Sequence, residues 1–345
     1  MTVDLTRKIA LRVAMLAVTA VSLYLLAPSL LVVFASWPKL RRVAPLWLGA
    51  AVLFECLSYV ALWSLQRIAL RTQSWFAVGT SQLASGAIGS IVPGGAATAG
   101  AFQYRLLVRA GVSPGAVAAG LTATLAATTA VVMALPTFAL VAAVGSVAAP
   151  DGLRHAAYLG AGAFVLLLVI AVTAFGWDRP LVLVARAAQR AAGWLGRGDR
   201  FADLPARLLA QRDGLRRTFA ERPVVALLSA IGKWGFDYAA LLCILAGLGV
   251  RPDARLVLVA YATAMLLAMI PATPGGLGFV EAGLYGLLAL AGVGAGVAAV
   301  ATFAYRLVSF WLPLPAGLAA YLLARNRYGG VPIADVDAPG QIDLC

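Results

Sequence analysis

The chain has 345 residues, of which 62% are hydrophobic and 12% are charged, and its formal net charge is +13. Several uninterrupted apolar runs reach the roughly 20 residues that cross the hydrocarbon core of a bilayer, which excludes an ordinary soluble protein. The runs are continuous and lack the alternation, over segments of about ten residues, that is typical of a membrane β-barrel. We therefore predict an all-α polytopic membrane protein whose helices satisfy their own backbone hydrogen bonds.

Eight apolar segments are predicted to span the membrane, and two shorter segments, predicted to be broken or re-entrant helices, lie among them. In chain order the spans cover residues 9–36, 45–70, 74–92, 115–147, 155–176, 223–249, 253–271 and 296–324, and the shorter segments cover 93–112 and 274–293. Arg7 and Lys8 precede the first span, and no small-residue cleavage site follows it. We expect this span to be a retained helix and not a removed signal peptide.

Arginines are concentrated in one loop. Residues 177–222 contain ten arginines and five acidic residues, so the positive-inside rule places this loop in the cytoplasm. A solvated loop explains the charge better than a dedicated anionic-lipid site, and no nucleic-acid partner is predicted. The resulting topology puts both termini, including a flexible tail over 326–345, on the cytoplasmic side of a bacterial inner membrane. The basic connection at 39–42 falls on the other side and weakly violates the rule.

The two short segments repeat each other. "PGGAATAGAFQYRLLVRAGV" at 93–112 and "PGGLGFVEAGLYGLLALAGV" at 274–293 are identical at ten of twenty positions without a gap, whereas this composition gives about two matches by chance. In the preceding spans, Phe54-Glu55 corresponds to Phe236-Asp237 to within one residue of the same offset. We predict a single membrane domain over 1–345, with one repeat at about 45–147 and a second at about 223–325.

The two repeats are predicted to have opposite orientations in the membrane. The span at 45–70 runs toward the cytoplasm in this topology, and its counterpart at 223–249 runs away from it. Inverted repeats are characteristic of secondary transporters, whose broken helices meet near the bilayer midplane. Proline suits a helix start, and glycine permits close approach and unusual dihedral angles. The predicted breaks are therefore Pro93, Gly94 and Gly95 in one repeat and Pro274, Gly275 and Gly276 in the other.

The same residues carry a family resemblance. "MIPATPGGLGFVEAGLYGLLALAGV", followed by "AVATFAYRLVSFWLPLPAGLAAY", resembles the second signature of the lysylphosphatidylglycerol synthase transmembrane region, a flippase-like membrane family. "SIVPGGAATAGAFQYRLLVRAGVSPGAVAAG" resembles its first signature, and the resemblance covers about residues 45–326. In the larger synthases this region resembles a lipid flippase module, and a separate soluble domain makes the aminoacyl lipid from a charged transfer RNA. No stretch long enough for that domain follows the last predicted span, so the resemblance implies translocation without synthesis.

Five charged residues fall inside apolar runs, where an ionised group costs at least roughly 2.5 kcal/mol at a helix centre. They are Glu55, Lys233, Asp237, Glu281 and Arg306. Lys233 and Asp237 are four residues apart on one helix face, so they form either a structural ion pair or, with Glu55, a proton or charge relay. Glu281 and Arg306 lie beside a predicted break, and we predict a functional pair near a cavity, with a structural pair as the alternative.

Arg105 and Arg109 lie four residues apart on the first short helix. At the cytoplasmic headgroup level they are suited to binding a lipid phosphate, and snorkelling to the interface is an equally favoured alternative. The three cysteines, Cys56, Cys243 and Cys345, have neither disulfide nor metal spacing. No phosphate-loop motif is present, so ATP hydrolysis by that route is excluded, and no cofactor, metal or catalytic residue is predicted.

The leading hypothesis is a lipid translocase that moves an anionic or modified phospholipid, or a polyprenyl-linked lipid, between leaflets. Membrane lipids are its predicted partners, and Arg105, Arg109 and Arg306 would contact phosphate. One alternative is an accessory subunit that presents lipid to a separate lipid-modifying enzyme. The other is an intramembrane lipid-modifying enzyme. The oligomeric state is not predicted, because small residues are too common throughout the sequence to mark a dimer face.

Overall fold

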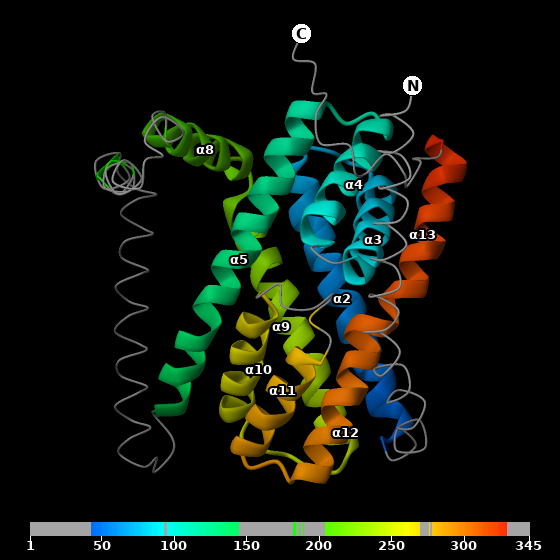
Figure 1. Ribbon diagram of the computed structural model, residues 1–345, viewed down its shortest axis with the longest axis vertical. Coiled ribbons are helices and arrows are strands. Elements are labelled where there is room, and N and C mark those ends of the chain that lie inside the picture. The colour runs from blue at the N-terminus through cyan, green and yellow to red at the C-terminus, as the bar shows by residue number, and fades with distance from the viewer. Residues whose placement is uncertain are drawn as a thin grey trace, which may run out of the picture.

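The computed structural model describes residues 43–92, 95–144, 204–269, 276 and 278–329, together with positions 182, 183, 186 and 189. Within these residues every regular element is helical, which confirms the all-α prediction for this part of the chain. The elements, in chain order, are α2 (Pro45–Ala69), α3 (Trp75–Ile91), α4 (Gly95–Arg109), α5 (Pro114–Val144), α8 (Leu204–Phe219), α9 (Pro223–Gly247), α10 (Ala254–Ala268), α11 (Phe279–Leu290), α12 (Ala295–Arg306), the π-helix η3 (Leu307–Trp311) and α13 (Pro313–Tyr328). Figure 1 shows them as a bundle.

Four helical stretches in the described residues are long and apolar enough to cross a membrane. They are Pro45–Ala69, Pro114–Ala139, Pro223–Gly247 and Ala295–Tyr328. Large apolar side chains on their outer sides are more than half exposed, among them Leu53, Leu125 and Leu228. Such surfaces are stable against lipid tails and unfavourable in water. The chain is therefore a multi-pass membrane protein.

The predicted number of eight spans is not confirmed. The segments at 74–92 and 253–271 form α3 and α10, which have 17 and 15 residues. At 1.5 Å per residue these helices are about 25 and 22 Å long, short of the roughly 30 Å hydrocarbon core. The segments at 9–36 and 155–176 lie outside the described residues.

Each short helix packs against one of the segments predicted to be broken. α3 packs on α4, and α10 packs on α11. In Figure 1 the α3–α4 pair occupies the upper half of the bundle, and the α10–α11 pair occupies the lower half. Because each pair extends through only part of the bundle, each pair has helix ends near the middle of the bundle.

α2 and α9 form the most extensive helix contact and run in opposite directions. The backbone N–H of Ala44, just before α2, donates to the carbonyl of Gly247 at the end of α9 at 3.0 Å. Further along, the rings of Phe54 and Phe236 stack with centroids 6.2 Å apart. The largest buried apolar cluster surrounds this pair and also draws on α10, α11 and α12.

The two repeated segments end in the same turn. Gly111 after α4 and Gly292 after α11 have φ angles of +90° and +86°, values that favour glycine at the end of a helix. In each turn the amide of the next residue donates to the carbonyl five residues earlier, at 3.1 and 3.0 Å. The following helices begin at Pro114 and Ala295, which are also equivalent positions.

Two elements were not predicted from the sequence. Part of the basic loop at 177–222 is the helix α8. The span predicted at 296–324 contains the π-helix η3, in which the Leu312 amide donates to the Leu307 carbonyl at 2.8 Å. Pro313 follows directly, and because it lacks an N–H group it cannot continue the ordinary hydrogen-bond ladder. π-Helical turns are frequent at functional sites, and this one begins immediately after Arg306.

Candidate functional site

Glu281 and Arg306 form a close ion pair. The Arg306 Nε atom lies 2.7 Å from Glu281 Oε1, and the two side chains are 10% and 28% exposed. Arg306 is the last residue of α12, and its guanidinium also lies over the Phe310 ring, 4.3 Å from the centroid. The predicted partners are thus in contact.

Glu281 projects from the first turn of a helix that begins inside the bundle. α11 starts at Phe279, after Gly278, whose φ of +78° is a left-handed conformation suited to glycine. A carboxylate in the first turn is stabilised by the positive end of the helix dipole. The second carboxylate oxygen of Glu281, Oε2, is buried and has no hydrogen-bond partner among the described residues. It remains able to accept another hydrogen bond.

Asp237 lies at the centre of a second buried group. It is 3% exposed and sits on α9, and its Oδ2 atom accepts hydrogen bonds from the hydroxyls of Tyr261 and Tyr305. The Tyr305 bond is 2.7 Å long. Lys233, one turn earlier on α9, supplies the opposite charge. Asp237 is therefore held as an acceptor by two donors and a cation.

Glu55 joins this group from α2. It is 5% exposed, and its carboxyl group interacts electrostatically with Asp237 and Lys233. Its Oε2 atom is buried without a hydrogen-bond partner in the described part of the chain. Nearby, the Ser58 hydroxyl donates to the Lys233 carbonyl at 2.9 Å and fixes α2 against α9. Two carboxyl groups, one from each helix, thus meet inside the bundle.

The two groups are adjacent because Tyr305 and Arg306 are consecutive residues of α12. Tyr305 contacts Asp237, and Arg306 contacts Glu281. A buried polar network, defined here as these four residues with Glu55, Lys233 and Tyr261, therefore crosses α2, α9, α10, α12 and α11. The sequence analysis identified its charged members but missed its two tyrosines, Tyr261 and Tyr305. Their signal is a tyrosine inside an apolar run, because a buried phenol needs a hydrogen-bond partner.

A small cavity lies on the other side of the π-helix. Its volume is about 60 Å³, and it is formed by α2, α3, η3 and α13. Phe310, which stacks on Arg306, lines it together with the polar side chains of Tyr59, Gln82 and Ser309. Gln82 has a buried side-chain oxygen without a partner among the described residues. A polar lining at this depth is suited to water or a polar group of a ligand.

The predicted break residues are described in part. Gly95 is the first residue of α4, and a Cβ atom built on it would lie 1.9 Å from the carbonyl oxygen of Gly89. Gly276 has a φ of +69°. Both observations agree with the need for glycine at these positions. Pro93, Gly94, Pro274 and Gly275 lie outside the described residues.

Arg105 and Arg109 are on a different helix pair from the polar network. α4 packs on α3 and α5, whereas α11 packs on α10 and α12. Arg105 is half-buried and Arg109, at the last position of α4, is exposed. Among the described residues, no three His, Cys, Asp or Glu side chains gather as they would around a metal ion.

The sequence matches the family model of the lysylphosphatidylglycerol synthase TM region over residues 9–317, which is most of the chain. The chain belongs to this family. The family match begins at residue 9, so it includes the first predicted span, which the resemblance at 45–326 had left out. A UPF0104 membrane protein of Methanothermobacter thermautotrophicus is 32% identical over 110 residues, which are 31% of this chain and 31% of that relative. Membership of the lysylphosphatidylglycerol synthase TM region family is compatible with a lipid-related membrane function.

Proposed function

We propose that the chain is a lipid translocase that moves an anionic or modified phospholipid, or a polyprenyl-linked lipid, between leaflets without ATP hydrolysis. The observation that carries this proposal is the buried polar network, in which Glu281 pairs with Arg306 at 2.7 Å at the start of a helix inside the bundle. Buried charges in membrane helices are costly, and they normally pair or line a pathway. Membership of the family supports a lipid as the cargo.

An inverted repeat would give the two access states that translocation needs. In Figure 1, helices at equivalent positions in the two repeats run in opposite directions. This holds for α2 compared with α9, and for α4 compared with α11. The equivalent residues Phe54 and Phe236 stack on each other, and their neighbours Glu55 and Asp237 also meet. When two repeats are related by a two-fold axis in the membrane plane, residues near that axis contact their equivalents in the other repeat. These observations support alternating access around the α2–α9 contact.

The carboxyl pair is suited to carrying a proton. Two ionised carboxyl groups that meet inside a membrane protein repel each other, so a proton on one of them stabilises the pair. Asp237 accepts from Tyr261 and Tyr305 and faces Lys233, so the proton belongs on Glu55. Release and uptake of this proton would couple lipid movement to a proton gradient across a bacterial inner membrane, with both chain termini on the cytoplasmic side.

A reconstituted transport assay tests the proposal. The purified chain is placed in liposomes with fluorescent phospholipids, and the initial rate of exchange between leaflets is measured by quenching from outside. We expect Arg306→Ala and Glu281→Gln to slow exchange at least about tenfold, which corresponds to roughly 1.4 kcal/mol of lost stabilisation. Arg251→Ala is the matched control, because Arg251 is exposed in the turn between α9 and α10.

Three results would contradict the proposal. Equal exchange by the native chain and by both variants would remove the role of the ion pair. No exchange by the native chain, together with co-purification of a lipid-modifying enzyme, would favour the accessory-subunit hypothesis. A changed lipid mass after incubation would favour an intramembrane lipid-modifying enzyme. The assay with a set of headgroups also identifies the preferred lipid.

A further inference from the structure

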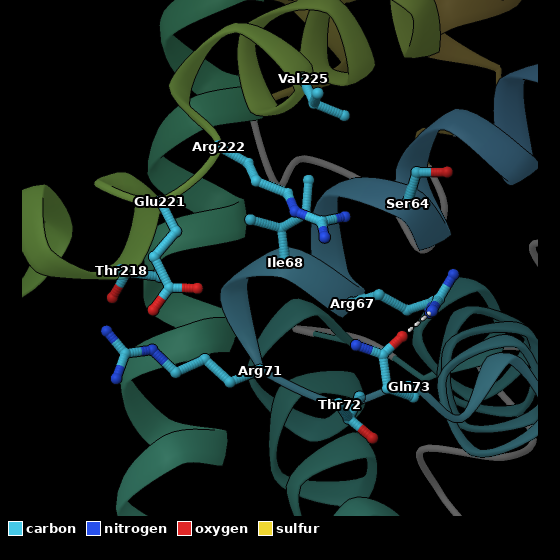
Figure 2. Close-up of a pocket in the computed structure, with 10 residues that line it drawn as sticks. All are labelled: Ser64, Arg67, Ile68, Arg71, Thr72, Gln73, Thr218, Glu221, Arg222 and Val225. Atoms are coloured by element: carbon cyan, nitrogen blue, oxygen red, sulfur yellow. Dashed lines mark hydrogen bonds between the residues drawn. The ribbon is translucent and has the colours of Figure 1, made fainter.

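A second polar site lies at the end of the bundle where α2 ends and α9 begins. It is a cavity of about 360 Å³ between the C-terminal end of α2, the end of α8 and the start of α9 (Figure 2). Its polar lining includes Arg67, Arg71, Thr72, Thr218, Glu221 and Arg222. Ligand pockets in proteins range upward from about 300 Å³, so the cavity can hold a lipid headgroup but not a whole lipid.

The cavity favours an anion. Three guanidinium groups and one carboxylate line it, which leaves an excess of positive charge. Figure 2 shows Arg222 extending into the middle of the group, with Arg71 directed to one side, toward Glu221 and Thr218, and Arg67 to the other, beside Gln73. The first turn of α9 carries no acidic residue, so the positive end of that helix dipole adds to the potential. Guanidinium groups bind phosphate through paired charge-assisted hydrogen bonds.

Arg67 is held in place and retains an unused donor. Its Nη2 atom donates to Gln73 Oε1 at 2.7 Å, and its guanidinium lies over the Trp75 ring, 4.2 Å from the centroid. Its Nε atom is buried and has no hydrogen-bond partner among the described residues. A buried donor without an acceptor is rare and calls for a ligand or water. A side chain that merely snorkels into water would not be fixed in this way.

Arg71 has an unusual backbone conformation beside the same cavity. Its φ of +50° lies in the left-handed region, and it is alone in this among the non-glycine residues that the structure describes. Its Nη2 atom donates to the Arg217 carbonyl of α8 at 3.0 Å. The Thr72 amide donates to the Arg67 carbonyl at 3.1 Å, so this conformation closes the C-terminal end of α2. The hydrogen bond to α8 holds the Arg71 side chain in the cavity wall.

The surroundings of the cavity indicate a lipid. α2 and α9 both qualify as membrane spans, so the cavity at their ends lies at headgroup level. On α9, directly after Arg222, the apolar side chains of Val224, Leu227 and Leu228 are 66%, 58% and 61% exposed. A headgroup bound in the cavity would place its acyl chains along this apolar surface.

We propose that this cavity binds the phosphate of an anionic phospholipid headgroup from the adjacent leaflet. Arg67 and Arg222 contact the phosphate oxygens, and the acyl chains lie against the start of α9. The site is separate from the Glu281–Arg306 pair and does not require translocation. An accessory subunit that presents lipid would use it in the same way, so a failure here and a failure of the translocase proposal are distinguishable.

Lipid titration of the purified full chain in detergent tests the site. Binding of phosphatidylglycerol and of phosphatidylcholine with the same acyl chains is measured by native mass spectrometry. We expect the native chain to bind phosphatidylglycerol more tightly, and Arg67→Gln and Arg222→Gln each to weaken that binding about tenfold without changing the binding of phosphatidylcholine. Arg251→Gln, at the opposite end of α9, is the control and should leave both affinities unchanged.

Two outcomes overturn the proposal. One is phosphatidylglycerol binding that is unchanged in both variants. The other is displacement of the lipid by glycerol 3-phosphate at equal concentration, because the site would then recognise a soluble phosphate ester. Arg222 is exposed, so Arg222→Gln should keep the native unfolding temperature. If Arg67→Gln disturbs the fold, the phosphatidylglycerol affinity of Arg222→Gln still tests the proposal.

Discussion

Asp237 and Glu55 differ in their surroundings although they are both buried carboxylic acids. Asp237 has two tyrosine donors and a lysine, whereas Glu55 has a free, buried carboxylate oxygen. The sequence predicted both as relay residues from their position in apolar runs. It could not predict which of them is the better acceptor, because that depends on Tyr261, which comes from another helix. Because their surroundings differ, we expect substitutions of Glu55 and of Asp237 to have different effects.

Glu55→Gln should preserve the fold and remove proton coupling. The amide of glutamine can donate to Asp237 as a protonated carboxyl does, but it cannot release a proton. We expect lipid exchange in liposomes to become insensitive to an imposed pH gradient, while exchange without a gradient continues. Rates are compared with and without a gradient in the native chain and the variant. A variant that still responds to the gradient as the native chain does would contradict the role of Glu55.

Asp237→Asn should destabilise the chain by about 2 kcal/mol, because it removes a counter-charge of Lys233, which is half-buried on an apolar helix. The asparagine oxygen can still accept from the tyrosines, so the loss is mainly electrostatic. The free energy of unfolding is measured by denaturant titration in mixed micelles. Adding Lys233→Met to Asp237→Asn should restore most of the stability. If the two substitutions are instead additive, Lys233 is not the partner of Asp237.

The junction between α3 and α4 depends on close backbone contact. A Cβ atom on Gly95 would overlap the Gly89 carbonyl, whereas one on Gly100 would meet nothing within 4 Å. We expect Gly95→Ala to destabilise the chain by about 3 kcal/mol through overpacking. Gly100→Ala, on the same helix, should stabilise it by about 0.5–1 kcal/mol. The unfolding temperatures of both variants are compared with that of the native chain, and equal values for the two would contradict the tight junction.

The ends of the described helices were predicted from the sequence more accurately than the number that cross the membrane. Long apolar runs placed α2 and α9 to within two residues at either end. The short helices α3 and α10 were predicted to span the membrane because their composition is apolar. Whether an apolar helix of this length crosses or turns back depends on the helix packed beside it. The π-helix also escaped prediction, because Pro313 alone is compatible with a kink or a break.

The whole molecule has a strongly basic end. α2, α4 and α13 end there, and α9 begins there beside α8, at the upper end of Figure 1. Those positions carry most of the arginines in the described residues, including Arg67, Arg109 and Arg222, while Arg251 and Arg255 are at the other end of α9 and the start of α10. The sequence predicted this clustering in part, since the loop at 177–222 was assigned to one side. The cavity between Arg67 and Arg222 could not be predicted, because these two lining residues are 155 positions apart in the sequence.

Site-directed labelling tests the orientation of the basic end. In a chain without its native cysteines, Glu221→Cys and Arg251→Cys place single thiols at opposite ends of α9, and both positions are exposed. The positive-inside rule puts the basic end in the cytoplasm. In intact cells a membrane-impermeant maleimide should therefore label Cys at position 251 and not at position 221, and permeabilisation should make both reactive. Labelling of position 221 alone in intact cells would reverse the orientation, and it would place the arginine cavity against the outer leaflet.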